Sequence, residues 1–569
     1  MAGIGYGVSI QDGRCVPTPV PAQQVRTRAD QTQNSAGGFV YAVDPLQRLH
    51  RFLFLGADGG SYYASERQLK LENAQVVVNL TKEHHGKKIV DEIKEISCSG
   101  RAPKQDQCIF ALAIVARLGC EEDRKAAFAA LKDVCRTPTH LFMFVANSEQ
   151  LVPGSTGWGR AMRKGVCDWY NSKEAKDLAY AISKYVQRNG WSNCDILRLC
   201  HVKPATPDHD TIFGWVVGKR ALPDPPELEL LSAEGKRAVE YLKAVESAKT
   251  ASEDDLCELI KTHRLPRETI APERLNSLRV WATLLDGMPM TAMLRNLNKM
   301  TKVGVFDNSD AVRDVTSRFT DIEVLRRARL HPLNILVAMH TYAQGKGDKG
   351  SLQWNPKREI VDALQAAFYL SFKTVEPTGK RFCLALDVSG SMTFHKIAGL
   401  GISCAQAATA MAMCTVRTEN ACKTMCFSAV PYQYNWSSFA SHGAVNESGF
   451  KELDLKVGDD IITATRKTTN LPFSGTDCSL PMRWAMQNNK EFDVFVVYTD
   501  CETYQGPVHA DEALRQYRVS SGIDAKLIVV GMVSNGFTIA DPNDAGMLDI
   551  VGFDSAAPEI MRLFLTGQI

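Results

Sequence analysis

The spacing of hydrophobic side chains changes once along the chain, near residue 379. From about residue 44 to residue 372, apolar residues recur every three to four positions, which is the period of amphipathic helices. Short breaks rich in Gly, Pro and Asn separate these stretches, and no fixed repeat length is visible. Consecutive helices of this kind pack as an α-solenoid or an irregular helical bundle. The clearest predicted helices span residues 108–118, 124–134, 173–188, 233–247, 332–342 and 359–372.

Beyond residue 379 the pattern is that of an α/β domain, because apolar runs of strand length alternate with helical stretches. The predicted strands lie at residues 381–388, 423–430, 492–500 and 525–533, and the predicted helices at residues 397–415, 479–486 and 511–517. Such alternation predicts a parallel sheet with helices on both faces. A functional site is then expected at the carboxyl ends of the strands.

These patterns divide the chain into three predicted parts. Residues 1–37 are rich in Gln, Pro, Thr and Gly with few large apolar side chains, and are predicted to form a flexible extension. Residues 38–378 form the helical part and residues 379–569 the α/β part. The predicted fold class is therefore α followed by α/β, a helical solenoid joined to a doubly wound parallel sheet.

Composition narrows the class of protein. Of 569 residues, 45% are hydrophobic and 23% are charged, as in ordinary globular proteins. No stretch reaches the roughly 18 apolar residues of a membrane span, and the N-terminus lacks the pattern of a secretory signal. The 16 cysteines include no CxxC pair, which excludes zinc ribbons and thioredoxin motifs. We expect a reduced protein of the cytoplasm, with nuclear presence, and no membrane association.

Charge is distributed unevenly along the chain. From Lys380 onwards there are 15 Lys+Arg and 20 Asp+Glu, a net charge of −5, so the preceding residues carry 51 against 44, a net charge of +7. The most basic stretch runs from Arg160 to Arg220, with 11 basic and 6 acidic residues. An acidic part joined to a basic part suggests two separate tasks.

Oxygen-bearing side chains follow the predicted strands of the acidic part. Asp387, Ser389 and Ser391 come directly after the first strand, and alternate residues of that loop point the same way. Thr476 lies in a loop before a helix, and Asp500 follows the strand FDVFVVY. Oxygen ligands with little negative charge suit a hard cation, Mg²⁺ or Mn²⁺. The alternative is that these residues only cap helices and turns.

In the basic part, the segment 173–188 is predicted to be one helix. Asn171 and Glu174 have the spacing of a capping box, and Asn189-Gly190 supply a stop. The predicted core stripe consists of Leu178, Ile182, Tyr185 and Val186, with Lys173, Lys176, Lys184 and Arg188 on the opposite face. Trp158, Trp169 and Tyr180 are expected to be exposed aromatic residues nearby.

Ser192 is predicted to start a second short helix, CDILRLC, which leads into His201. Arg198 on that helix and Lys203 beyond it add positive charge. Basic side chains beside exposed aromatics are typical of contact with RNA phosphates and unstacked bases. The alternative is an ordinary solvated helix face, with His201 as a turn residue.

Several long strings strengthen the RNA interpretation by resemblance. VDPLQRLHRFLFLGADGGSYYASERQLKLENA, WGRAMRKGVCDWYN, LRLCHVKP and FKTVEPTGKRF resemble the family of the Ro (SS-A) ribonucleoprotein autoantigen, which defines the TROVE domain. The DxSxS loop with its later Thr and Asp resembles the metal-ion-dependent adhesion site (MIDAS) of von Willebrand factor A domains. The first resemblance implies a HEAT-like helical ring that binds Y RNAs on its outer surface and single-stranded ends of misfolded noncoding RNAs in its hole. Lys184, Arg188 and His201 match residues of that Y RNA surface.

The resemblance also implies a monomeric subunit of a ribonucleoprotein that acts in noncoding RNA quality control, with an acidic protein partner at the metal site. A different class of function is a metal-dependent protein-adhesion scaffold with no direct role in RNA binding. Phosphoester hydrolysis by Asp387, Asp500 and a cation is a third option. No P-loop, Ser/His/Asp order or second-metal carboxylate cluster accompanies these two residues, so we expect no enzyme.

Overall fold

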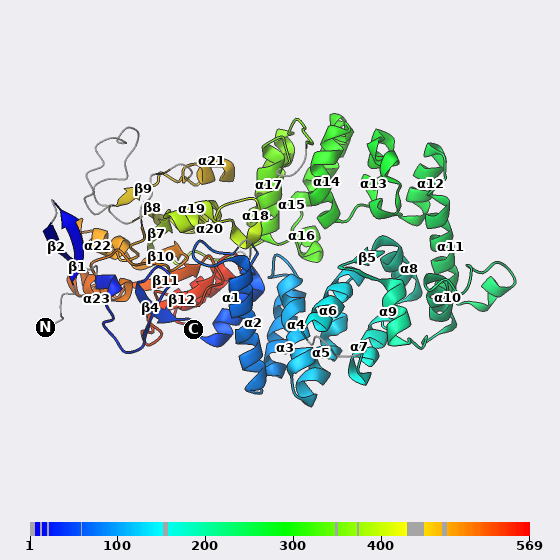
Figure 1. Cartoon of the computed structure of the whole chain (residues 1–569). Coiled ribbons are helices and arrows are strands. Elements are labelled where there is room, and N and C mark those ends of the chain that lie inside the picture. Colours follow the sequence, from blue (N-terminus) through cyan, green and yellow to red (C-terminus); the bar gives the residue numbers. More distant parts are fainter. Residues whose placement is uncertain are drawn as a thin grey trace. The chain divides into compact units, whose positions relative to one another are not determined.

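The structure is a computed structural model, and it describes residues 6–11, 14–19, 22–58, 60–151, 158–347, 351–372, 375–428, 449–468, 471 and 475–569. The chain forms two compact units that interleave along the sequence (Figure 1). The α/β unit comprises residues 1–73, 331–340 and 365–569, and the helical unit comprises residues 74–330 and 341–364.

Residues 45–370 fold into consecutive helices, as the three-to-four spacing predicts. They are α1 (Pro45–Leu55), α2 (Glu66–Lys82), α3 (Gly86–Ser99), α4 (Asp106–Leu118), α5 (Glu121–Val134), α6 (Pro138–Gln150), α7 (Arg160–Asn171), α8 (Ala175–Lys184), α9 (Asn193–Cys200), α10 (Pro207–Val216), α11 (Ala233–Ser247), α12 (Glu253–His263), α13 (Leu278–Asp286), α14 (Met290–Lys302), α15 (Ser309–Thr320), α16 (Ile322–Ala328), α17 (Pro332–Ala343) and α18 (Arg358–Leu370). Short helical turns η2 (Glu227–Leu230), η3 (Arg267–Thr269), η4 (Pro272–Asn276) and η5 (Val305–Asp307) lie between them.

The helical unit is built by stacking of neighbouring helices. α3 packs on α5, and α4 packs on both α5 and α6, so successive helices alternate between layers (Figure 1). The middle of α4, from Ala111 to Val115, is fully buried, which explains its almost uninterrupted apolar sequence. α5 begins with three acidic residues, whose charge favours a helix N-terminus. These contacts are those of a helical-repeat scaffold in which each helix buries its apolar face against the next.

The α/β unit is built on a six-stranded sheet in the order β13-β11-β10-β7-β8-β9. All neighbouring strands are parallel except β9, which pairs antiparallel with β8. The strands are β7 (Arg381–Asp387), β8 (Ala421–Phe427), β9 (Phe450–Glu452), β10 (Val494–Thr499), β11 (Lys526–Gly531) and β13 (Met547–Val551). Its helices are α19 (Gly390–Phe394), α20 (Cys404–Thr418), α21 (Ile461–Arg466), α22 (Leu480–Gln487), α23 (Ala510–Ser521) and α24 (Ala557–Leu565), with the turn η6 (Ile397–Gly399).

The strands β7 and β10 are buried over nearly their whole length, as expected of a parallel sheet covered on both faces. β10 pairs with β7 on one side and with β11 on the other. The carboxyl ends of these central strands carry the loops that begin at Asp387 and Asp500. The predicted fold class, a helical-repeat part followed by a doubly wound parallel sheet, is confirmed.

The prediction of a flexible extension is wrong for residues 22–37. Short strands β3 (Gln31–Gln33) and β4 (Phe39–Ala42) form a small antiparallel sheet with β12 (Phe537–Thr538). Val40 belongs to the hydrophobic core of the α/β unit, and Gln23 is completely buried. The segment holds its place by hydrogen bonds from polar side chains, so its low content of apolar residues was misleading. Before it, β1 (Tyr6–Gln11) and β2 (Arg14–Pro19) pair as an antiparallel hairpin, and the turn η1 (Ala22–Gln24) follows.

Two predicted helices differ in their ends. The helix expected over 173–188 is α8, which ends at Lys184, and the strands β5 (Gln187–Arg188) and β6 (Trp191–Ser192) form a hairpin after it. Asn189 and Gly190 have φ values of 53° and 79°, so the predicted stop became a hairpin turn. The helix expected over 397–415 begins only at Cys404, because Ser403 caps it.

Candidate functional site

The five predicted metal ligands are all buried in loops at the carboxyl edge of the sheet. Asp387 ends β7, and its Oδ1 accepts a hydrogen bond of 2.9 Å from the backbone amide of Ser389. The hydroxyls of Ser389 and Ser391 share a hydrogen bond of 3.1 Å. The Ser391 hydroxyl also hydrogen-bonds the carboxyl group of Asp500. The structure therefore brings four of the five predicted ligands into one polar cluster.

Thr476 reaches this region through its backbone. Its carbonyl oxygen accepts hydrogen bonds of 3.1 Å from the amides of Tyr504 and Gln505, in the loop that follows Asp500. Two residues later, the Cys478 thiol lies 3.6 Å from the Thr499 hydroxyl, which in turn donates to Asp387. The loop of Thr476 is thus tied to the cluster, and the role of its hydroxyl as a ligand stays a prediction.

The two carboxyl groups of the cluster are in an unfavourable environment for negative charge. Burial, together with the proximity of Asp500, raises the pKa of Asp387 to about 7. Burial likewise raises the pKa of Asp500 above its usual value. The Thr499 hydroxyl donates a hydrogen bond of 2.7 Å to Asp387 Oδ2, which opposes this rise only in part.

These donors fit a hard divalent cation. Two carboxylates and three hydroxyls are oxygen ligands only, and two negative charges match the charge of Mg²⁺ or Mn²⁺. A bound cation would also relieve the repulsion that raises the pKa of Asp387. The alternative interpretation as helix caps is less complete, because Ser389, at the start of α19, makes no side-chain capping hydrogen bond.

A further carboxyl group beside the cluster was missed in the sequence. Glu502 is buried, and burial together with Asp500 raises its pKa to about 7. Its oxygens accept hydrogen bonds from the Ala36 amide at 3.1 Å and from Asn535 Nδ2 at 3.3 Å. Its position two residues after Asp500 is the sequence feature that could have indicated Glu502 as part of the site. Its partner Ala36, however, lies 466 residues away in the sequence.

The N-terminal segment holds the two loops that carry Thr476 and Asp500. The Gln23 amide donates hydrogen bonds of 2.8 Å to Asp477 Oδ1 and 2.9 Å to the Val508 carbonyl. Its oxygen accepts from the Thr503 hydroxyl at 2.6 Å and from the Gly506 amide at 3.0 Å. One fully buried side chain thus links both loops.

Asn34 continues this connection to the loop after β10. Its amide donates to the carbonyls of Cys501 and Thr503, at 3.2 and 2.8 Å. A side chain at Gly38 would lie 1.8 Å from the Thr503 carbonyl oxygen, so this position requires glycine. Residues 22–38 are therefore a structural part of the candidate metal site.

Tyr63, in the chain that follows α1, also lies beside the acidic cluster. Burial and the carboxyl groups of Asp500, Glu502 and Asp387 raise the pKa of Tyr63 above its usual value. A side chain at Gly399 would approach Asp58 Cβ to 2.8 Å, so the same segment packs closely on the chain after α19. Tyr63 is a phenol placed close to all three carboxyl groups, which sequence analysis did not single out.

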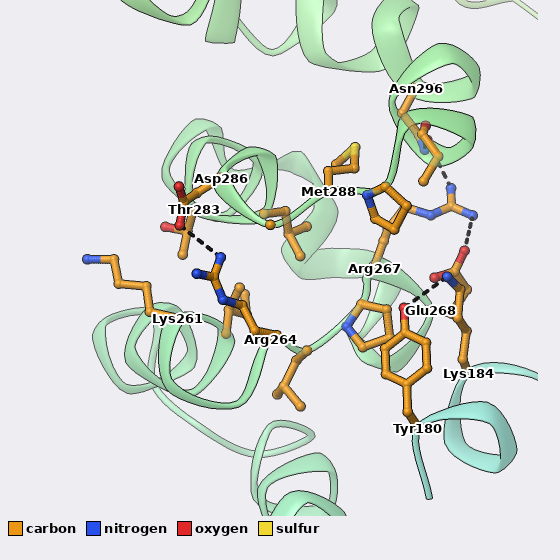
Figure 2. A pocket seen from close by; sticks show the side chains of 17 residues that line it. Tyr180, Lys184, Lys261, Arg264, Arg267, Glu268, Thr283, Asp286, Met288 and Asn296 are labelled. Carbon is orange, nitrogen blue, oxygen red and sulfur yellow. Dashed lines mark hydrogen bonds and ion pairs between the residues drawn. The ribbon is translucent and has the colours of Figure 1, made fainter. Parts of the chain in front are cut away.

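In the helical unit, Lys184 ends α8 and stands among aromatic rings. Its ammonium group lies 3.1 Å from the Tyr180 hydroxyl (Figure 2). It also lies 5.2 and 5.4 Å from the ring centroids of Tyr180 and Tyr185. Burial lowers the pKa of Lys184, but Tyr180, Tyr185 and Glu268 outweigh it, so the pKa is raised. The ammonium group is half-buried and remains charged.

Arg188 and His201 are both exposed and lie near opposite ends of α9. Arg188 is in the hairpin that precedes this helix, where it pairs with Trp191, and Asn193, the first residue of α9, donates to the Tyr185 carbonyl at 2.9 Å. His201 caps the other end with a φ of 49°. Eight helical residues span about 12 Å. Arg188 and His201 are therefore separated by roughly the length of α9, and we refer to these two residues together with Lys184 of α8 as the basic strip.

The other predicted RNA residues lie around the same helices. The backbone carbonyl of Lys203 accepts a hydrogen bond of 2.9 Å from the Asn171 side chain. The backbone carbonyl of Lys173 lies 3.0 Å from Nε2 of His209, a residue of α10. Lys173 lies 4.2 Å from the centroid of the Trp169 ring. Arg198 donates to the Val217 carbonyl at 3.0 Å, whereas Lys176 is exposed on α8.

Three details of the predicted basic helix are wrong. Val186 is 64% exposed, because α8 ends two residues before it, and Trp158 and Trp169 are buried rather than exposed. Asn171 closes α7, and Glu174 caps α8 without a side-chain hydrogen bond, so there is no capping box. The capping box belongs instead to Ser192 and Asp195 of α9, which confirms the predicted start of that helix.

A helical-repeat unit combined with a parallel sheet that ends in a DxSxS loop defines a helical scaffold protein with a von Willebrand A type unit. Comparison with known families identifies it further. The TROVE domain model matches residues 32–341 and 338–380, and the Ro60 vWA domain model matches residues 381–565. The chain belongs to the TROVE-domain family of Ro60 proteins.

Individual relatives match almost the whole chain. A protein of Caenorhabditis elegans named RNA-binding protein RO60 is 39% identical over 97% of this chain and 92% of its own length. A Deinococcus radiodurans protein of the same name is 38% identical over 96% of this chain and 97% of its own length. The crystal structure of the Deinococcus radiodurans RO (RSR) protein matches with a TM-score of 0.66 and 35% identity, covering 92% of this chain and all of that one.

Proposed function

We propose that this protein is an RNA-binding component of a ribonucleoprotein. Small structured RNAs of the Y RNA type bind along α8 and α9, and single-stranded ends of misfolded small noncoding RNAs enter a ring formed by the helical part. The role is noncoding RNA quality control. Membership of the TROVE-domain family and two relatives named RNA-binding protein RO60 support this proposal.

The observation that carries the proposal is the basic strip between Arg188 and His201. Both side chains are exposed, and Lys184, four residues before Arg188 in the sequence, has a charged ammonium group. Lysine and arginine side chains on one surface contact RNA phosphates, and a histidine or tyrosine can stack on an unpaired base. Lys173, Lys176, Arg198 and Lys203 extend the same surface.

A resident Mg²⁺ or Mn²⁺ is proposed at Asp387, Ser389, Ser391, Thr476 and Asp500. When bound, such a cation would supply a positive charge that attracts a carboxylate of an acidic protein partner. The buried, mutually repelling carboxyl groups support this assignment. The protein's own residues orient the site, since Thr499 and Ser389 fix the Asp387 carboxyl group.

We further propose a monomeric, non-enzymatic protein subunit of the cytoplasm, with a nuclear fraction. In the described part of the chain, no group of three or more His, Cys, Asp and Glu side chains is arranged to hold a metal, as a two-metal phosphoesterase would require. None of the described helices is long and apolar enough to cross a membrane.

Crosslinking and sequencing of the RNA that copurifies with the protein tests the proposal. Small structured noncoding RNAs should be enriched with the parent chain and depleted with Lys184→Ala/Arg188→Ala. The second candidate function is a protein-adhesion scaffold, which the buried acidic cluster favours. In that case no RNA would be enriched, and partner capture would be abolished by chelation but not by salt.

A further inference from the structure

Two cysteines that are 33 residues apart in the sequence meet where α7 packs on α9. Cys167 lies on α7 and is half-buried, whereas Cys200 is the last residue of α9 and is buried. The Cys167 thiol donates to the Cys200 carbonyl oxygen at 3.5 Å, and the two thiol groups also hydrogen-bond each other. Neighbouring helices that place two sulfur atoms in contact can be joined by a disulfide with a small local movement.

The surroundings of Cys167 favour its ionised form. A hydrogen bond from the Cys200 thiol lowers the pKa of Cys167 below the usual value of a thiol, and a hydrogen bond from the Lys203 backbone amide and the charge of Lys164 act in the same direction. The contact with Cys167, together with burial, raises the pKa of Cys200, so Cys167 is the first of the pair to ionise. A half-buried thiolate reacts with oxidants that reach it from solvent, and a neighbouring thiol can then displace the oxidised group.

Several other thiols lie in environments that suppress this reactivity. Burial raises the pKa of Cys108 and the pKa of Cys135, which are both fully buried in the helical unit. In the α/β unit, burial likewise raises the pKa of Cys383 and the pKa of Cys404. Buried structural thiols of this kind are inert towards oxidants. The lowered pKa and partial exposure of Cys167 distinguish it from these four cysteines.

The loop that follows α9 is attached to α7 beside this pair of thiols. His201 follows the helix in the left-handed conformation, with a φ of 49°, and the Lys203 amide hydrogen-bonds the sulfur of Cys167. One turn further along α7, the Asn171 side chain donates to the Lys203 carbonyl at 2.9 Å and accepts from the Ala205 amide at 3.0 Å. His201 and Lys203 belong to the proposed RNA surface, so a shift in the last turn of α9 moves two of its residues.

We propose that Cys167 and Cys200 form a reversible disulfide when the protein meets a peroxide, and that this disulfide weakens RNA binding through the loop that carries His201. The effect on RNA rests on the proposed RNA-binding function, whereas the disulfide itself does not. As the two sulfur atoms approach bonding distance, the hydrogen bond from the Cys167 thiol to the Cys200 carbonyl is lost. The last turn of α9 is then drawn towards α7, and the loop with His201 moves with it.

The oxidation proceeds in two steps, and its electrons go to the peroxide. The Cys167 thiolate attacks one oxygen atom of hydrogen peroxide: an S–O bond forms, the O–O bond breaks, and the released hydroxide takes up a proton to become water. The Cys200 sulfur then attacks the sulfenic acid: an S–S bond forms, the S–O bond breaks, and the thiol proton leaves with the hydroxide as a second water. The two thiols lose two electrons, which the peroxide gains. A small dithiol reverses the reaction by exchange and becomes a disulfide itself.

Peptide mapping of the full-length protein tests the disulfide. After treatment with hydrogen peroxide, the remaining thiols are alkylated and the protein is digested with trypsin without reduction. Cys167 lies in the tryptic peptide 165–173 and Cys200 in the peptide 199–219. We expect these two peptides to be joined in most molecules, and to be separated again by dithiothreitol. Cys200→Ser should instead leave Cys167 as a sulfenic acid that dimedone captures.

Cys194→Ser is the matched control, because Cys194 is another cysteine of α9, is half-buried, and lies in a different tryptic peptide, 189–198. This variant should form the same disulfide as the parent. Filter binding with a structured RNA then tests the effect on RNA. Peroxide should weaken the affinity of the parent and of Cys194→Ser about fivefold, and dithiothreitol should restore it. The affinity of Cys167→Ser should not respond to peroxide.

Four results would contradict parts of this assignment. Separate peptides in the oxidised parent, with Cys167 carried on to sulfinic acid, would overturn the disulfide. A disulfide that leaves RNA affinity unchanged would overturn its effect on RNA. Weakened RNA binding by oxidised Cys167→Ser would mean that peroxide acts through another residue, and would overturn the effect assigned to the pair. A reduced parent that binds no structured RNA would overturn the proposed function itself and leave the disulfide in place.

Discussion

The acidic cluster of the α/β unit and the basic strip of the helical unit differ in how their geometry is held. In the acidic cluster every predicted ligand is buried, and hydrogen bonds from Thr499, Ser389 and the N-terminal segment fix the loops. Along the strip, Arg188 and His201 are open to solvent. The cluster is therefore a preorganised site for one small ion, whereas the strip is an adaptable surface for a large polyanion.

The same difference appears in the electrostatics. Burial disfavours the ionised form of the two carboxyl groups and so raises their pKa values. A bound cation would therefore stabilise the ionised carboxylates. Arg188 of the strip is exposed to water, and salt screens its attraction for phosphate. Chelation should therefore affect the first site and ionic strength the second. If the two sites are independent, each can be disabled by substitution without loss of the other.

The largest effect is expected from Asp387→Ala or Asp500→Ala. Each removes one of the two charged ligands, so Mn²⁺ affinity of the full chain should fall at least about 100-fold. RNA affinity should stay within about threefold of the parent value. Isothermal titration with Mn²⁺ and filter binding with a structured RNA measure the two effects. Asp524→Ala is the matched control, because Asp524 is an exposed carboxylate of the same unit. Unchanged Mn²⁺ binding by Asp387→Ala would disprove the metal site.

The second prediction concerns pH. In the metal-free protein the folded-state pKa of Asp387 is raised to about 7, above the unfolded value of 3.8. Between these values the folded state holds a proton that the unfolded state has released. The unfolding free energy should therefore decrease as pH rises from about 4 to about 7, by an amount on the order of 1 kcal/mol per pH unit. Glu502 adds a contribution of the same sign.

Urea unfolding in chelator at pH 5, 6, 7 and 8 measures this slope. Since other groups also titrate, the informative quantity is the difference between the parent and Asp387→Asn, which should have a smaller slope. Mn²⁺ should reverse the trend, because metal binding needs the deprotonated carboxyl group and gains strength as pH rises. Parallel curves for both proteins in chelator would contradict the assigned pKa shift.

The third prediction concerns the basic strip. Lys184→Ala/Arg188→Ala should weaken binding of a structured RNA about tenfold and flatten the plot of log affinity against log salt by one to two units. His201→Ser should weaken binding less, because it removes no permanent charge. Mn²⁺ affinity should not change in either variant. Lys125→Ala, at an exposed position on α5, is the control for loss of positive charge alone. An unaltered salt slope in a folded variant would argue against this surface.

Sequence patterns predicted the elements well where the pattern is local. The period of apolar residues predicted α11 with the ends that the structure shows. The apolar run that ends at Asp387 predicted the strand β7. The DxSxS loop with the later Asp500 predicted most of the acidic cluster, because all four residues follow strand ends. The turn at Asn189-Gly190 was recognised as a stop. That it forms a hairpin depends on pairing between Arg188 and Trp191, which periodicity does not report.

Contacts between distant segments could not be predicted in this way. Gln23 and Asp477 are 454 residues apart, and the sequence around Gln23 has the composition of a flexible tail. Its order comes from hydrogen bonds to the loops of the α/β unit, which hydrophobic patterning cannot detect. Glu502 was missed for the same reason, since its environment depends on Ala36 and Asn535.

The smallest effect on Mn²⁺ affinity is expected from Gln23→Ala. This variant tests whether the N-terminal segment holds the loops of the acidic cluster in place. The change removes the acceptor of the Gly506 amide and one hydrogen bond each from the Thr503 hydroxyl and Asp477, which costs about 1–3 kcal/mol of unfolding free energy. Because these groups lie in the loops of Thr476 and Asp500, Mn²⁺ affinity should also fall several-fold.

Gln24→Ala is the control for this variant, since Gln24 is the adjacent residue, has the same side chain and is only half-buried. Urea unfolding and Mn²⁺ titration of the full chain separate two roles for Gln23. A loss of stability with unchanged Mn²⁺ affinity would mean that Gln23 only supports the fold, whereas a loss of both makes it a positioning residue of the site. RNA affinity should be unaffected, because Gln23 is a buried residue of the α/β unit and the basic strip belongs to the helical unit. If structured-RNA binding fell together with Mn²⁺ affinity, the two sites would not be independent, and the distinction between a preorganised ion site and a separate adaptable RNA surface would have to be abandoned.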